Sequence, residues 1–227
     1  MPAELIRRRN LPHWDMPDAA YFVTTCLEGS IPARGLLDLE EYRTELRRRP
    51  RPKNVSESDW SVKQWKLLFV RADHWLDHEP AVRHLVDPRL AQIVRDAMYF
   101  FAGERYDLLA FVVMPSHFHW VFQPLAAWVK QLKTGKIKKS PRERIVQSIN
   151  RHSSNRCNKL RGVYGTFWQH ESYDHWIRDV DELERIIHYV EANPVKPGLA
   201  ISPADWPFSS AHDRKLKCLE FGEPLTR

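Results

Sequence analysis

Two histidines stand one residue apart in the stretch LLAFVVMPSHFHWVFQP, which is otherwise apolar. Its β-branched and aromatic residues predict two strands joined by a turn at Met114-Pro115-Ser116. Side chains two residues apart in a strand point to the same face, so His117 and His119 share one face. Two imidazoles placed in this way can bind one metal ion.

This pair alone is a weak signal, because two surface histidines on a solvated sheet face are the commoner explanation of such a pattern. The alternation predicts that Phe118, Trp120 and Phe122 pack against helices and leave both imidazoles on the opposite, open face, directed at a shared point. Rings on opposite faces, or a ring buried against a helix, would end the metal-site interpretation. A third ligand and a reactive group are also needed.

A helix expected within DVDELERIIHYVEANPVKPG supplies candidates for both, since it opens with an acidic cap and ends at Asn193-Pro194. Its apolar stripe consists of Leu183, Ile186, Ile187 and Val190. Tyr189 lies on the flank of that stripe, and Asn193 follows one turn later on the same side. A phenol and a carboxamide so spaced can approach one point on a neighbouring sheet. Taken singly, Tyr189 is better explained as a boundary tyrosine and Asn193 as a helix-ending residue.

Four further segments predict the elements that must position these residues. We expect a first strand at about 19–28, a helix at 87–101 with an Asp cap and a first-turn proline, one or two helices within 125–160, and a fourth strand or extended arm within 166–178. The proline-containing segment 41–53 is expected to form a basic loop or lobe. The order predicts an α+β fold, a ferredoxin-like antiparallel sheet with helices on one face.

Composition sets broader limits. With 227 residues, 43% of them hydrophobic, the chain is long enough for one good-sized domain with a real core. The formal charge of +6 suits a polyanionic partner, although many basic proteins bind no nucleic acid. Three widely spaced cysteines argue against a disulfide framework, and neither a secretory signal nor a membrane span is visible. We therefore expect a cytoplasmic protein without a membrane partner.

Four motifs occur together in the order VVMPSHFHWVF, WQHESYDHWIRD, YVEANPVKPGLA and DWPFSSA. In order and spacing they resemble the single-tyrosine HUH transposases, and most of all the REP-associated tyrosine transposases. The resemblance covers about residues 19–211. It suggests a single domain over 1–227, with a basic insertion at about 36–80 outside the common core and a C-terminal tail at about 199–227.

The resemblance implies roles for four residues: His117 and His119 bind a metal, Asn193 is its third contact, and Tyr189 is the nucleophile. It implies a metal-dependent single-stranded DNA endonuclease and strand transferase, with an HUH nuclease fold, acting on hairpin (REP-like) DNA through a 5′-phosphotyrosine intermediate. The expected cofactor is Mg²⁺ or Mn²⁺, and the expected state is a monomer or a homodimer. Tyr173 is the alternative nucleophile.

Basic residues near these motifs are expected to contact DNA phosphates, although runs of charge commonly just face water. The candidates are Lys133, Lys136, Lys138, Lys139, Arg142, Arg144 and Arg178. Tyr173, His175 and Arg178 can instead be architectural.

Two other functions stay open. The protein could bind hairpin DNA with its nuclease lost or dispensable. It could also be a zinc-dependent hydrolase, which would need another histidine or carboxylate at metal spacing; no such pair stands out, and the chain is short for the barrel enzymes that use an HxH pair.

Overall fold

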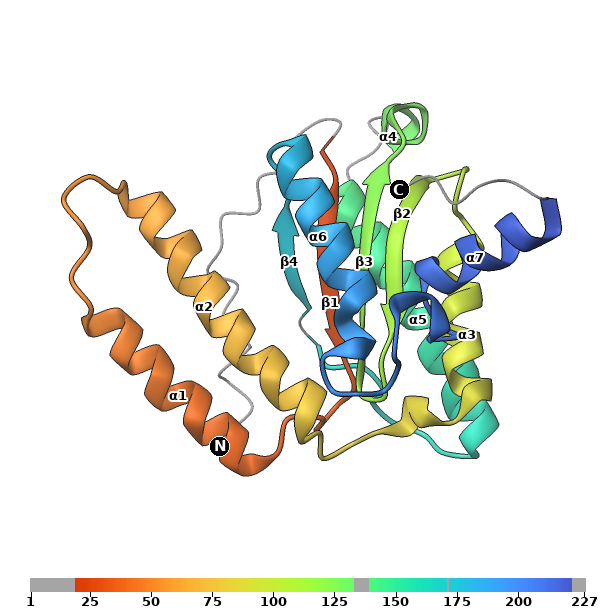
Figure 1. Ribbon diagram of the computed structural model, residues 1–227, viewed down its shortest axis with the longest axis horizontal. Coiled ribbons are helices and arrows are strands. Elements are labelled where there is room, and N and C mark those ends of the chain that lie inside the picture. The colour runs from red at the N-terminus through yellow and green to blue at the C-terminus, as the bar shows by residue number, and fades with distance from the viewer. Residues whose placement is uncertain (1–18, 133–138, 171, 222–227) are drawn as a thin grey trace.

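The computed structural model describes residues 19–132, 139–170 and 172–221. Within them, four antiparallel strands form one sheet in the order β2-β3-β1-β4 (Figure 1). The strands are β1 (Tyr21–Cys26), β2 (Tyr106–Val113), β3 (His117–Pro124) and β4 (Tyr173–Trp176). The α+β antiparallel fold is confirmed, and the segment expected to be a fourth strand or an arm contributes a short edge strand beside β1.

Helices cover both faces of this sheet, rather than one. On one face, α3 (Pro88–Tyr99) and α5 (Pro141–Arg161) bury the aromatic side chains of β3, as the alternation predicts. On the other face, α6 (Val180–Ala192) packs against side chains that include Phe22 and Val121. The helices on this second face matter for the site, because His117 and His119 point to the same side of the sheet as α6.

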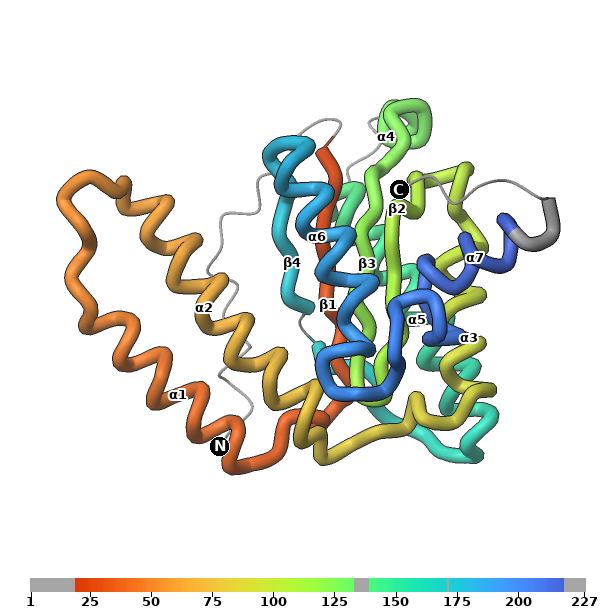
Figure 2. Tube along the Cα trace, in the orientation of Figure 1, coloured from red at the N-terminus to blue at the C-terminus, as the bar shows by residue number. Residues whose placement is uncertain are grey.

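The segment between β1 and α3 is an antiparallel pair of helices, α1 (Ala33–Arg48) and α2 (Glu57–His78), which lean away from the sheet in Figures 1 and 2. The loop expected at 41–53 is therefore wrong up to Arg48. Leu39 and Leu46 of α1 are buried and set a helical spacing, and the prolines at 50 and 52 follow the helix instead of interrupting it. We call these two helices the α1–α2 hairpin.

The remaining elements are α4 (Ala126–Leu132), α7 (Ser210–Phe221) and three 3₁₀ turns at His84–Val86, Asn193–Val195 and Pro203–Asp205. Both expected acidic caps are confirmed: Asp87 accepts a hydrogen bond from the backbone of Arg89, and Asp179 from that of Glu182. No helix in the described ranges has the length and apolarity needed to cross a membrane.

Candidate metal centre and nucleophile

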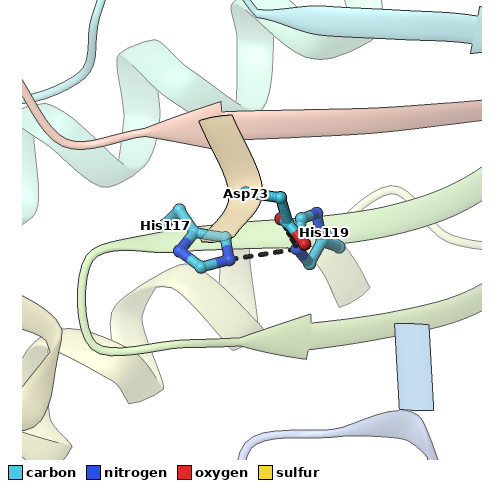
Figure 3. A group of neighbouring side chains, drawn as sticks. All are labelled: Asp73, His117 and His119. Atoms are coloured by element: carbon cyan, nitrogen blue, oxygen red, sulfur yellow. Dashed lines mark hydrogen bonds and ion pairs between the residues drawn. The ribbon is translucent and has the colours of Figure 1, made fainter. Parts of the chain in front are cut away.

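His117 and His119 lie on the same face of β3 and point at each other. Their Nε2 atoms are 3.0 Å apart, so the expectation of a shared point is confirmed (Figure 3). The expectation of an open face is wrong, because both side chains are 0% exposed and lie beneath α2. Burial against a helix was expected to end the metal-site interpretation, and both rings are buried in this way; a metal site is therefore proposed on different grounds, the side chains that the helix presents. Here α2 presents carboxylates.

Hydrogen bonds fix the orientation of both rings. The Ser116 hydroxyl donates to the carbonyl oxygen of Leu76 at 3.0 Å, so its oxygen is left to accept from Nδ1 of His117 at 2.9 Å. The Nε2 atom of His117 therefore carries a lone pair, and burial lowers the pKa of His117 to about 3, which keeps the ring neutral. Nδ1 of His119 lies 2.7 Å from the Thr24 hydroxyl. A lone pair aimed at a second nitrogen 3.0 Å away favours a cation or a proton between them.

Asp73 of α2 completes a buried three-residue group with the histidines. Its Oδ1 atom is 3.2 Å from Nε2 of His119, and one ligand atom from each of the three residues lies within 4.8 Å of the others. Burial alone would raise the pKa of Asp73, but the neighbouring imidazoles and the hydroxyl of Tyr189 outweigh it and hold that pKa below its usual range. Asp73 is thus an anion beside two imidazole nitrogens.

Tyr189 joins this group through the other oxygen of the same carboxylate. Its hydroxyl donates a short hydrogen bond to Oδ2 of Asp73, and its ring centre is 5.6 Å from that of His119. Burial, and then the charge of Asp73, raise the pKa of Tyr189 well above its usual range. The ammonium of Lys196 lies 3.8 Å from the centre of the Tyr189 ring. The expected nucleophile therefore lies beside the expected metal ligands.

Asp77 follows Asp73 by one helical turn and faces His117. Its Oδ1 atom is 3.7 Å from Nε2 of His117, and its side chain is 3% exposed. Burial, and then the charge of Asp73, raise the pKa of Asp77 to about 8. Sequence reasoning missed both acids because they lie in the insertion. One signal was available: Asp73 and Asp77 follow Phe69 by four and eight residues, so the three share one helix face, where apolar side chains would be expected.

Asn193 and Tyr173 are placed less directly. Asn193 is fully buried at the end of α6, and neither its Nδ2 nor its Oδ1 atom has a hydrogen-bond partner among the described residues. In the described structure the Asn193 side chain therefore makes no hydrogen bond to either histidine. Tyr173 lies on β4, where its ring stacks on Phe69 at 4.0 Å. Of the two candidate nucleophiles, Tyr189 is the one in contact with the His–Asp group.

The candidate DNA contacts divide into three groups. Lys133, Lys136 and Lys138 lie outside the described residues. Arg142 is 5% exposed and pairs with Asp174 of β4, so its charge belongs to an internal ion pair. Arg178 is partly exposed, 3.9 Å from Asp59, and its backbone N–H donates to Glu182, which also bonds His175; this supports an architectural part for the segment.

Lys139 and Arg144 lie at an open depression beside α5 with a volume of about 850 Å³. Arg105, Arg151 and His152 line it too, and no acidic residue is among the described residues that do. This basic depression, as we call it below, adjoins a helix that packs on the sheet face opposite the histidines. Arg105 and Arg151 were not among the residues expected from the sequence.

Comparisons with known proteins agree with the motifs. No family model matches the chain. It is 30% identical over 122 residues to the REP-associated tyrosine transposase of Escherichia coli, covering 53% of this chain and 64% of that protein. It is 30% identical over 115 residues to a protein of Haemophilus influenzae with the same family name, covering 47% and 60%. The chain thus spans about three fifths of the length of the curated relatives it matches.

A solved structure of a REP-associated tyrosine transposase bound to a REP hairpin has the same fold, with a TM-score of 0.54 and 16% identity. The match covers 97% of this chain and 94% of that one. The resemblance read from the motifs is confirmed: the chain is a homologue of the REP-associated tyrosine transposases and shares their fold.

Proposed function

We propose that this protein is a metal-dependent single-stranded DNA endonuclease and strand transferase that acts on hairpin DNA through Tyr189. The observation that carries the proposal is the hydrogen bond from Tyr189 to Asp73, whose other oxygen lies against His119. It gathers a nucleophile, an anionic acceptor and two imidazoles from α6, α2 and β3. The curated relatives are named transposases, and the structural neighbour is bound to a REP hairpin, which supports the same substrate class here.

The residues present fit a divalent cation. His117 and His119 offer nitrogen, and Asp73 offers an oxygen. The resemblance adds Asn193, and among the described residues neither that oxygen nor the buried polar atoms of Asn193 have a hydrogen-bond partner. Unpartnered buried polar atoms are rare and call for an explanation such as an ion. When bound, such an ion would withdraw charge from an oxygen of the scissile phosphate. We propose Mn²⁺ or Mg²⁺, since imidazole suits Mn²⁺ and carboxylate oxygen suits both.

Tyr189 would attack phosphorus with its phenol oxygen. The new O–P bond makes a 5′-phosphotyrosine as the P–O3′ bond breaks and releases a 3′-hydroxyl. Asp73, already hydrogen-bonded to the hydroxyl, is placed to receive its proton. The cation of Lys196 over the ring would favour the negative charge that develops on the phenol. Attack by another 3′-hydroxyl on the phosphotyrosine reverses these bonds and gives strand transfer.

Phosphates of the hairpin stem would contact the basic depression, where Lys139, Arg144 and Arg151 offer positive charge without a lining acid. Lys133, Lys136 and Lys138 stay proposed contacts on the strength of their sequence position next to Lys139. Arg178 also stays a proposed contact, because its side chain is partly exposed. We omit Arg142, since it is buried in an ion pair.

Covalent capture of DNA tests the nucleophile. The protein would be incubated with a 3′-labelled hairpin carrying a single-stranded flank, with Mn²⁺ or with EDTA, and adducts resolved on a denaturing gel; a 5′ label would instead follow the released strand. We expect Tyr189→Phe to abolish the adduct while hairpin binding is retained, because the ring still packs. Tyr173→Phe, the matched control, should still form it. An adduct with Tyr189→Phe but none with Tyr173→Phe would place the nucleophile on β4.

The same assay distinguishes two alternative functions. Burial of both imidazoles and the proton held on Tyr189 favour a hairpin-binding protein without cleavage, which would bind DNA and form no adduct in any metal. A metal-dependent hydrolase now has, in Asp73, the carboxylate that the sequence did not reveal. Such a hydrolase would lose activity on its substrate in the His119→Ala variant but keep that activity in the Tyr189→Phe variant.

A further inference from the structure

Asp77 is a buried acid with an unsatisfied atom pointing at the metal site. Its side chain is 3% exposed, and Oδ1 has no hydrogen-bond partner among the described residues. Oδ1 lies 3.7 Å from Nε2 of His117. Leaving a buried polar atom unpaired costs about 1–3 kcal/mol, and more for a charged group, so its position calls for a partner.

The spacing of the two acids on α2 brings both to one side. Residues four apart on a helix are neighbours on its surface, so Asp73 and Asp77 face the sheet together. Asp73 lies 3.2 Å from Nε2 of His119, and Asp77 lies 3.7 Å from Nε2 of His117. Atoms that bind one ion at about 2.1–2.2 Å are about 3 Å apart at a right angle and about 4.3 Å apart when opposite. Both of these separations fall in that range, and a four-residue site needs a shift of the Asp77 side chain, because the ligand atoms that already lie within 4.8 Å of one another come from Asp73, His117 and His119.

We propose that Asp77 is a ligand of the same centre as His117, His119 and Asp73, so that the α1–α2 hairpin supplies both carboxylates and the bound ion joins α2 to the sheet. The inference rests on the metal centre of the proposed function, but not on its nuclease activity. Two imidazole nitrogens and two carboxylate oxygens favour Mn²⁺ over Mg²⁺, because Mg²⁺ prefers oxygen and keeps several waters.

Other contacts of α2 are consistent with this role. The Ser116 hydroxyl holds the carbonyl of Leu76, between the two acids, and Phe69 stacks on Tyr173. Helix α2 is thus fixed to the turn before β3 by a contact between the two acids, and to β4 by a contact one helical turn before Asp73. A helix held in this way keeps both acids near the imidazoles, so that a shift of the Asp77 side chain alone would bring it to the ion.

Manganese titration of the full-length, metal-stripped protein tests the inference. MnCl₂ would be added alone, and the free ion followed by its electron paramagnetic resonance signal. We expect Asp77→Asn to weaken Mn²⁺ binding at least about tenfold, as loss of even an outer partner of a metal ligand does. Glu57→Gln is the matched control: it removes the same charge from the same helix, 20 residues and about 30 Å away, and should leave affinity unchanged.

Hydrogen exchange of the wild-type protein gives a second measurement that needs no variant to fold. With Mn²⁺, backbone amides in the last two turns of α2 should exchange more slowly than without it, while those in its first turn should not change. Unchanged exchange around Asp77 would overturn the inference.

The outcomes separate the two proposals. If Asp77→Asn binds Mn²⁺ within twofold of wild type while Asp73→Asn and His119→Ala bind weakly, Asp77 is not a ligand and the three-residue centre stands. If the wild-type protein binds no Mn²⁺, both proposals fail. If Asp77→Asn weakens binding but Tyr189 forms no DNA adduct, the inference stands and the nuclease function falls.

Discussion

The hydrogen bond between Tyr189 and Asp73 should be measurable as a contribution to stability. A hydrogen bond to a charged group contributes about 1.5–3 kcal/mol, and Tyr189→Phe removes the donor while the ring keeps its packing on Phe22. For a protein of this size, 1 kcal/mol shifts Tm by about 2–4 °C. We therefore expect Tyr189→Phe to lower Tm by about 3–12 °C in metal-free buffer at pH 7.

A double-mutant cycle isolates this contact from other effects of the substitutions. Urea unfolding followed by tryptophan fluorescence would give the free energy of unfolding for wild type, Tyr189→Phe, Asp73→Ala and the double variant. The cavity left by Asp73→Ala cancels in the cycle, so the coupling energy should be about 1.5–3 kcal/mol. Tyr173→Phe is the control, since in the described part of the chain its hydroxyl makes no hydrogen bond. A coupling below about 0.5 kcal/mol would mean that Tyr189 and Asp73 do not interact in solution.

Three further predictions concern the rest of the molecule. Arg144→Glu and Arg151→Glu should each weaken hairpin binding and lower the slope of log affinity against log salt by about one, measured by fluorescence anisotropy; an unchanged slope would show that the basic depression binds no phosphate. Trp120→Ala, at a fully buried position, should lower the free energy of unfolding by about 3–5 kcal/mol, a loss that a urea titration would reveal or disprove. Burial would raise the pKa of Glu182, but Lys66 and other donors outweigh it and lower that pKa to about 2, so its stabilisation should be complete above the ordinary value of 4.5 and lost as pH falls towards 2. Wild type should therefore exceed Glu182→Gln in stability at pH 6 and approach it near pH 2.5, which urea midpoints at the two pH values would check.

The parts of the site that sequence alone predicted are those set by local periodicity. The alternation of Phe118 and Trp120 with the histidines follows from the geometry of a single strand, and any sheet with one apolar layer preserves it. The position of Tyr189 on the flank of the α6 stripe likewise follows from 3.6 residues per turn. Neither prediction depends on which segment of the chain packs against the strand or the helix.

The parts that were missed depend on packing between distant segments. Asp73 meets His119 across 46 positions of sequence, and no local pattern specifies that α2 folds back over β3. The α1 helix was obscured in a simpler way, because its basic end runs directly into two prolines. Its Leu39 and Leu46 were the signal for a helix, and Leu39 packs in one apolar cluster with Leu76 of α2.

The two carboxylates of α2 and the carboxamide of Asn193 are both candidates to complete the ligand set of the proposed metal centre. The resemblance assigns the third contact to Asn193, at the end of the nucleophile's own helix, whereas the described contacts place Asp73 and Asp77 of the α1–α2 hairpin against the imidazoles. Asn193 is nevertheless fully buried, and neither of its polar side-chain atoms has a partner within the part of the chain that the structure describes, which is as costly as the unpaired Oδ1 atom of Asp77. A six-coordinate ion can accept two nitrogens and three oxygens from the protein and still bind a phosphate oxygen. On this proposal the acids of the hairpin would supplement the ligand that the resemblance implies, and the ion would join the α1–α2 hairpin to the sheet.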